Sequence, residues 1–234
     1  MAPDTPVVLA VDTSHQVAVG LARGGEVLAT LVVADPRAHV EQLTPSVTDC
    51  LAAAGLGIEQ VGSVVIGLGP GPFTGLRVGI VTGWTLAATR GIGWEGVCSL
   101  DVIARQWPDD AEVPDDFVVC SDARRSEVYW ARYRDGARVD GPHVAAPGEL
   151  PDLPTTGPGV EHHAEHLGDR VVDGPRALDP GVMAAIGWQL PSAGAEPLYL
   201  RRPDATEPGR RKSALPTGPR LLRGLTPRAG QEQP

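Results

Sequence analysis

A repeated strand pattern constrains the fold of this 234-residue chain more than any other feature. VVLAVDTSHQVAVGLARGGEV at 7–27 aligns with FVVCSDARRSEVYWARYRDGARV at 117–139, which places Asp12 on Asp122. In both copies a strand of buried type ends in the aspartate, and a short turn and an antiparallel meander follow. Strand–turn–strand patterns are common, but the shared aspartate favours duplication. We therefore expect two related lobes.

Hydrophobic periodicity and turn residues give the expected elements around this repeat. In the first half they are strands at 7–11, 17–22, 26–33 and 61–68 and helices at 39–55 and 74–89. In the second half they are a strand at 117–122, a helix at 179–190 with Asp179 as its N-cap, and an extended segment at 197–204. This places the two lobes at 1–105 and 106–204, with a basic, Pro/Arg-rich tail at 205–234.

The distribution of charge separates this tail from the rest of the chain. Residues 201–234 contain eight of the twenty basic residues and three of the twenty-nine acidic ones, a net charge of +5. The first 200 residues carry a net charge of −14, which makes strong nucleic-acid binding by this body alone unexpected. The tail could contact RNA or an acidic partner, but such tails are more often disordered.

Composition narrows the class of protein and its chemistry. Hydrophobic residues make up 42% and charged residues 21%, as in soluble globular proteins. No apolar run reaches the roughly 18 residues of a membrane span, and the N-terminus lacks a signal-peptide pattern, so we expect a cytoplasmic protein without membrane contact. The first lysine is Lys212, so the body offers no lysine for a P-loop or a Schiff base.

The glycine-rich stretch GLGPGPFTGLRVG at 67–79 first suggests a phosphate-binding loop. It matches neither GxxxxGK[ST] nor GxGxxG, and Pro70 and Pro72 lack the amide donors that an anion site uses. We interpret it as a rigid turn into a helix that carries Gly75, Gly79 and Gly83 on one face. Two explanations for this row remain open: close packing on the helix's own sheet, or close approach of a partner's helix.

Several motifs, in order along about residues 7–205, resemble the TsaB (YeaZ) family. They are LAVDTS at 9–14, HVEQLTP at 39–45, GLGPGPFTGLRVG at 67–79, GVCSL at 96–100, DARRSEVYWA at 122–131 and PLYLRRPDA at 197–205. The duplicated strands and this resemblance together imply an α/β fold of the actin-like ATPase (ASKHA) class. Each of its two lobes would have a mixed sheet with packing helices.

The resemblance implies a role in making threonylcarbamoyladenosine at the tRNA adenosine 3′ to the anticodon. The chain would be a noncatalytic partner subunit of a paralogous TsaD-type transferase, with a TsaE-type ATPase as a further partner. It would form a homodimer when alone and meet tRNA only through the complex. The metal-binding histidine pair of the transferase is replaced here, because Ser99 and Ile103 stand in SLDVI where the two imidazoles would be.

The expected site is therefore a partner interface, with no catalytic residue and no metal ligand. The interface residues expected on the two helices at 39–55 and 74–89 are Leu43, Val47, Leu51, Gly75, Leu76, Gly79, Ile80 and Gly83. Asp12, Thr13 and Ser14 are expected to be a vestigial nucleotide site, with no cofactor required and only weak ATP or ADP binding. The alternatives are an ATP-dependent phosphotransferase or ATPase and a peptidase, although neither GxSxG nor HExxH occurs.

Overall fold

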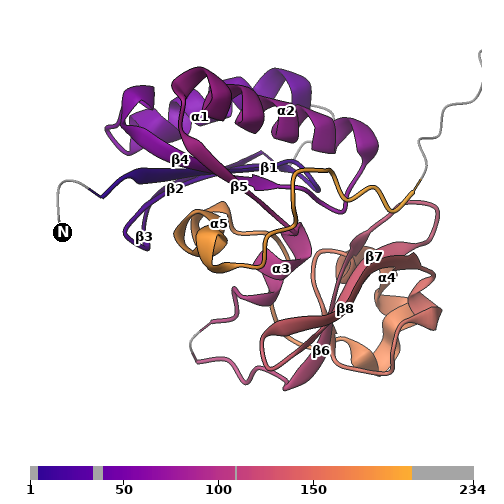
Figure 1. Cartoon of the computed structure of the whole chain (residues 1–234). Coiled ribbons are helices and arrows are strands. Elements are labelled where there is room, and N and C mark those ends of the chain that lie inside the picture. Colours follow the sequence, from indigo (N-terminus) through magenta and orange to yellow (C-terminus); the bar gives the residue numbers. More distant parts are fainter. Residues whose placement is uncertain (1–4, 34–38, 109, 202–234) are drawn as a thin grey trace, which may run out of the picture. The chain divides into compact units, whose positions relative to one another are not determined.

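The computed structural model describes residues 5–33, 39–108 and 110–201 of the chain, and its first half is built on a five-stranded mixed sheet (Figure 1). The strands are β1 (Val7–Asp12), β2 (Val17–Arg23), β3 (Glu26–Val33), β4 (Val61–Gly67) and β5 (Gly93–Val97). Their order is β3-β2-β1-β4-β5, where β1 to β3 form the antiparallel meander and β4 and β5 run parallel to β1. Rows of Val, Ile and Leu on both faces make β1 and β4 almost fully buried strands.

The second sheet repeats this topology with one strand fewer. It contains β6 (Asp116–Asp122), β7 (Val128–Arg134), β8 (Ala137–Ala145) and the short β9 (Thr155–Thr156), in the order β8-β7-β6-β9. As in the first sheet, the first three strands are antiparallel and the last is parallel to the first. The duplicated α/β architecture that the repeat predicted is confirmed, with Asp12 and Asp122 as the last residues of β1 and β6.

Helices cover both faces of the first sheet. One face is covered by α1 (His39–Ala53) and α2 (Phe73–Arg90), and the other by α5 (Pro180–Ile186) (Figure 1). The short α3 (Ser99–Ala104) follows β5 and packs on β6 and β7, and α4 (Val160–Leu167) packs on the second sheet. Asp179 caps α5 as predicted, because its carboxylate accepts from the amides of Gly181 and Val182 at 2.7 and 3.3 Å. No helix within the described part of the chain combines the length and apolar character needed to cross a membrane.

The structure places α5 on a different lobe from the one expected from the sequence. Residues 106–204 were assigned to the second lobe, yet α5 packs on β1, β2 and β3 of the first. The approach is close: a Cβ on Gly20 of β2 would lie 2.0 Å from the carbonyl oxygen of Pro180. The following segment returns along the first sheet, where the amides of Ala193 and Leu198 donate to the carbonyls of Gly96 and Leu68. We call residues 191–201 the C-terminal strap.

One hydrophobic core joins the two sheets. It contains Ala10 and Val65 from the first sheet, Phe117 and Tyr133 from the second, and Met183 from α5, all nearly inaccessible to solvent. Contacts accordingly group the described residues, from 5 to 201, into a single compact unit. The predicted tail at 205–234 lies outside the described residues.

The Gly20–Pro180 contact yields a stability prediction. Gly20→Ala places a methyl group against rigid backbone, so we expect a loss of about 1–3 kcal/mol or more in the free energy of unfolding. This loss should exceed the stabilisation of about 0.5–1 kcal/mol that alanine normally provides over glycine inside a strand, because alanine loses less backbone entropy on folding. Urea denaturation measures the difference. Gly148→Ala, whose new methyl would meet no atom within 4 Å, is the control and should be near neutral.

A second prediction concerns Asp116 at the start of β6. Its carboxylate accepts bidentate bonds from Arg132 at 2.7 and 2.6 Å and a further bond from Arg134 at 2.8 Å. These bonds hold the pKa of Asp116 well below its usual range. The carboxylate therefore stabilises the fold above the unfolded-state pKa of about 3.9, and this contribution is lost as the pH falls.

Asp116→Asn should accordingly lower the melting temperature at pH 7, and the difference from wild type should shrink steadily as the pH is lowered from 5 to 2. Thermal unfolding followed by circular dichroism measures both values. If the difference in melting temperature stayed constant over that range, it would come from packing and not from the ionised carboxylate, and this would contradict the stabilising role given to the Asp116 charge.

Candidate functional site

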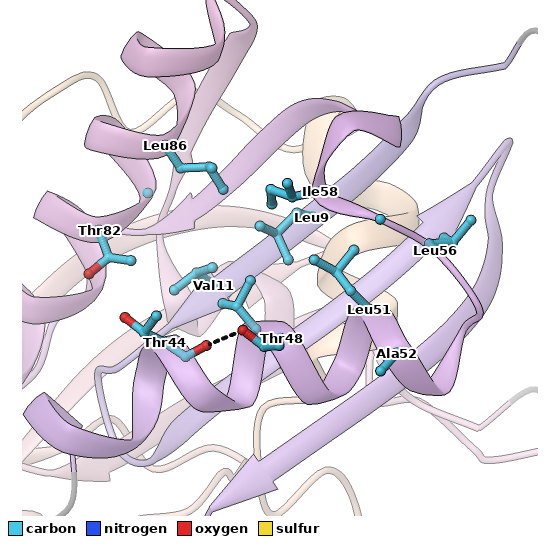
Figure 2. Close-up of a pocket in the computed structure, with 13 residues that line it drawn as sticks. Leu9, Val11, Thr44, Thr48, Leu51, Ala52, Leu56, Ile58, Thr82 and Leu86 are labelled. Carbon is cyan, nitrogen blue, oxygen red and sulfur yellow. Dashed lines mark hydrogen bonds between the residues drawn. The ribbon is translucent and has the colours of Figure 1, made fainter.

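A groove runs between α1 and α2 on the outer side of the first sheet. It encloses about 510 Å³, and Figure 2 shows Leu9 and Val11 of β1 between the two helices. Its walls are mostly small or apolar residues of the two helices and of the segment after α1: Thr44, Val47, Thr48, Leu51, Ala52, Leu56, Gly57, Ile58, Thr82, Gly83 and Leu86. The groove is therefore an apolar depression between two ridges.

The outer face of this helix pair is unusually poor in charge. Exposed helical faces normally carry charged side chains. The described part of the pair also exposes Glu41 and Asp49 on α1 and Arg77 on α2, but uncharged residues make up most of the exposed positions beside the groove: Thr44, Pro45, Thr48 and Ala52 on α1, and Thr74, Val81, Thr85 and Ala88 on α2. Val81 is 55% exposed, the highest value among the large hydrophobic residues of the described chain. We call this surface, together with the groove, the helix-pair surface.

The residues predicted for the interface on α1 divide between the core and the groove. Leu43 is buried and belongs to the core between the helix pair and the first sheet. Val47 is half-buried, and it and the buried Leu51 line the groove. Two of the three therefore border the helix-pair surface, and Leu43 anchors α1 beneath it.

The residues predicted on α2 lie on its buried face. Gly75, Leu76, Gly79, Ile80 and Gly83 are all buried within this chain, and only Gly83 also lines the groove. Of the two explanations left open for the glycine row, packing on the helix's own sheet is the one that the structure supports. The residues of α2 that face outward include Arg77 and the uncharged ones of the helix-pair surface, and their contact with a partner stays a prediction.

Thr13 explains why glycine is needed at position 79. The Thr13 hydroxyl donates to the carbonyl of Gly75 at 2.8 Å and accepts from the amide of Gly79 at 3.1 Å. These are the two groups that an α-helix pairs with each other, so the side chain inserts into the hydrogen-bond ladder of α2. A Cβ on Gly79 would lie 2.3 Å from that hydroxyl oxygen. The turn after β1 and the helix α2 are thus fitted to one another.

The other two residues of the expected nucleotide site also form internal bonds. Asp12 is buried, and its Oδ1 accepts from the amide and the hydroxyl of Ser14 at 2.8 and 2.6 Å. Its Oδ2 accepts from the Ser99 hydroxyl at 2.5 Å. Oδ1 therefore fixes the turn after β1, and Oδ2 holds the end of β1 to the start of α3. Nucleotide binding at Asp12, Thr13 and Ser14 remains a prediction.

The equivalent turn of the second copy has a different chemistry. Asp122 Oδ1 lies 3.2 Å from Nε2 of the buried His163 and accepts from the amide of Arg124 at 3.1 Å. His15, in the first copy's turn, is influenced by both aspartates: burial lowers its pKa, and the charges of Asp12 and Asp122 act in the opposite direction. Both repeated aspartates therefore influence the ionisation of His15.

The replaced metal positions and one histidine of the EHHAEH stretch at 161–166 make internal contacts. Ser99 donates to Asp12, and Ile103 is buried in the shared core. In the 161–166 histidine cluster, His162 and His166 are exposed, whereas His163 faces Asp122. Among the residues that the structure describes, no group of three or more His, Cys, Asp or Glu side chains is arranged to hold a metal ion.

Two features of the site were not predicted from the sequence. The sequence could have revealed the groove wall formed by Thr44, Thr48 and Ala52, because these small residues recur every four positions and so share one helix face. The sequence gives no indication of the left-handed backbone at Arg124, Arg125 and Ser126, since the stretch contains no glycine or asparagine.

Comparison with known proteins gives one consistent family along most of the chain. The family model "TsaD: tRNA N6-adenosine threonylcarbamoyltransferase" matches residues 27–186. An uncharacterized protein of Mycobacterium tuberculosis is 43% identical over 202 residues, 85% of this chain and 93% of that protein. The tRNA threonylcarbamoyladenosine biosynthesis protein TsaB of Escherichia coli is 33% identical over 129 residues, 54% of each chain. The structure of YeaZ from Pseudomonas aeruginosa is 27% identical, with a TM-score of 0.64 over 83% of this chain and all of that one.

Two substitutions at Thr13 distinguish the contribution of its hydroxyl to stability from that of its side-chain shape. Thr13→Val keeps the shape but removes the group that pairs with Gly75 and Gly79, so we expect a loss of about 1–3 kcal/mol in unfolding free energy. Thr13→Ser keeps the hydroxyl and should retain more of the stability. Chemical denaturation of the three proteins is the measurement. Equal stability of Thr13→Val and wild type would show that α2 closes its own ladder.

Proposed function

Because this chain belongs to the TsaB (YeaZ) family, within the larger group that the TsaD model describes, we propose that it is a noncatalytic partner subunit of a TsaD-type transferase. In this role it supports threonylcarbamoylation of a tRNA adenosine in the cytoplasm. The observation that carries the proposal is the helix-pair surface, an uncharged and partly apolar face built around a groove. Exposed apolar patches of this kind mark protein interaction sites.

The chemistry of the partner follows from the family match. A paralogue described by the same family model is expected to carry its own pair of helices on the corresponding sheet. Two such layers can pack with the ridges of one helix pair in the groove of the other. The small residues Thr48, Ala52 and Thr82 leave room for such a ridge above the floor at Leu9 and Val11.

The same surface accounts for self-association. A face that receives a related chain is nearly self-complementary, so two copies of this chain can pair around a two-fold axis when the paralogue is absent. The TsaE-type ATPase is a further partner of the proposed complex, and tRNA reaches this subunit in that complex. In this role the chain requires no cofactor of its own. Asp12, Thr13 and Ser14, whose polar groups are used internally, would bind ATP or ADP only weakly.

Val81 gives the sharpest test of the proposed interface. Val81→Glu places a charge in the middle of the surface without disturbing the buried face of α2, so we expect pairing to weaken by about 2 kcal/mol or more, roughly 30-fold in Kd. Light scattering of the full chain, alone and mixed with its TsaD-type paralogue, measures both the homodimer and the heterodimer.

Val139→Glu is the matched control. Val139 lies on β8 of the second sheet and is 50% exposed, close to the 55% of Val81, and it should leave both pairings unchanged. If Val81→Glu paired as well as Val139→Glu, the helix-pair surface would be the wrong interface. If wild-type chain and paralogue eluted separately, the proposed function itself would fail.

A further inference from the structure

The turn between β6 and β7 has a strained backbone. Arg124, Arg125 and Ser126 have φ of 62°, 55° and 58°, three successive left-handed residues without a glycine. The left-handed region is unfavourable for L-residues, because their Cβ comes too close to the following carbonyl oxygen. Such conformations persist only where the surrounding structure enforces them. This turn therefore depends on the contacts that hold it.

Some of these contacts come from the second lobe itself. Asp122 Oδ1 accepts from the amide of Arg124 at 3.1 Å and lies 3.2 Å from Nε2 of the buried His163 on α4. The amide of Ala123 donates to the carbonyl of Glu127 at 2.9 Å, and the amide of Glu127 donates to the carbonyl of Arg124 at 3.1 Å. These bonds close the base of the turn.

A further contact comes from the C-terminal strap, which runs from the first sheet to this turn (Figure 1). Arg201 donates to the carbonyl of Ala123 at 2.9 Å and forms an ion pair with Glu127. Its side chain is only 23% exposed. A guanidinium that engages a carbonyl and a carboxylate together makes a stronger contact than a single neutral hydrogen bond. The strained turn is therefore also the anchor of the strap.

Two residues before this anchor, the strap packs on the first turn of α2. The ring of Tyr199 lies 4.8 Å from that of Phe73, the first residue of the helix. The Arg77 guanidinium lies 3.9 Å over the Phe73 ring, and its Nε donates to the Tyr199 hydroxyl at 3.3 Å. The strap thus connects the β6–β7 turn of the second lobe with the start of α2 in the first.

The start of α2 lacks the usual local stabilisation. Helices are commonly stabilised at this end by a capping side chain and by acidic residues in the first turn. Here the N-cap is Pro72, which makes no side-chain bond to the helix, and the first turn contains no acidic residue. Tertiary contacts such as that of Tyr199 must therefore hold this end. Thr74, beside Phe73, belongs to the helix-pair surface.

We propose that Tyr199 and Arg201 form a latch that controls docking of a partner protein at the helix-pair surface. With Arg201 bound at the strained turn, Tyr199 stays on Phe73 and the start of α2 is held in position. When Arg201 is released, the turn relaxes, Tyr199 loses its anchor, and the helix-pair surface loosens at Thr74. A loosened surface must be ordered on binding, so its affinity falls. The effect on docking rests on the proposed function, whereas the hold of the strap on α2 does not.

The latch makes the β6–β7 turn a regulatory position. A ligand that displaced Arg201 from Ala123 or Glu127 would weaken docking at α2, although it would touch neither helix of the pair.

Hydrogen exchange of the full chain, followed by mass spectrometry, tests the hold of the strap. Arg201→Gln should speed exchange about tenfold or more in segments 122–128 and 73–80, because a hydrogen-bonded charged group is lost at the anchor. Light scattering with the TsaD-type paralogue, at a temperature where circular dichroism shows every variant folded, should give a Kd raised about fivefold or more.

Tyr199→Ala opens the other end of the latch and should raise the Kd to a similar extent. Because both residues act through one connection, the double variant Tyr199→Ala with Arg201→Gln should pair about as well as either single variant. Fully additive effects would show that the two residues act separately and would overturn the latch.

Arg90→Gln is the matched control. Arg90 is also on α2 and also donates to a backbone carbonyl, that of Glu59 at 2.8 Å, but this contact stays within the first lobe. It should leave pairing and exchange in 122–128 unchanged. Wild-type pairing by both Arg201→Gln and Tyr199→Ala would overturn the proposal. If the wild-type chain did not pair with the paralogue, the proposed function would fail, and unchanged exchange in 73–80 would still refute the hold of the strap on α2.

Discussion

The hydroxyl of Thr13 inside the hydrogen-bond ladder of α2 is the contact on which the rest of the first lobe depends. It fixes the distance between the end of β1 and the helix, and only glycine at 79 permits that distance. Asp12, the preceding residue, extends the connection to Ser99 and therefore to the segment that leads into the second lobe. Two adjacent side chains thus join a strand, a helix and the crossover between lobes.

This arrangement also shapes the helix-pair surface, which we propose as the partner interface. Because the glycine row lets α2 lie close to the sheet, its bulky residues Leu76 and Ile80 fill the core, and Val81 and small hydroxyl residues remain outside. The groove between α1 and α2 keeps its apolar floor at Leu9. The glycine row, for which the sequence left two explanations open, is thus buried beneath the helix-pair surface.

Much of the fold could be predicted because local sequence patterns specify its strands and the start of one helix. Rows of β-branched residues gave the strands, and Asp179 followed by a proline gave the start of α5. The side of α2 that packs on its own sheet could not be predicted, since a glycine row has the same pattern against a sheet or a second helix. The packing of α5 on β2 depends on a tertiary contact at Gly20, and a left-handed turn at Arg124 has no composition signal.

The placement of α5 has a consequence for how the chain is made. The strands of the first sheet lie between residues 7 and 97, but one of its faces is covered by Pro180–Ile186 and by residues of the second half of the chain in the shared core. During synthesis from the N-terminus, that apolar face stays open while almost ninety further residues are added. The first lobe therefore cannot bury this face until the second half of the chain has been translated. The duplicated halves mature together, and neither half made alone would bury its share of the common core.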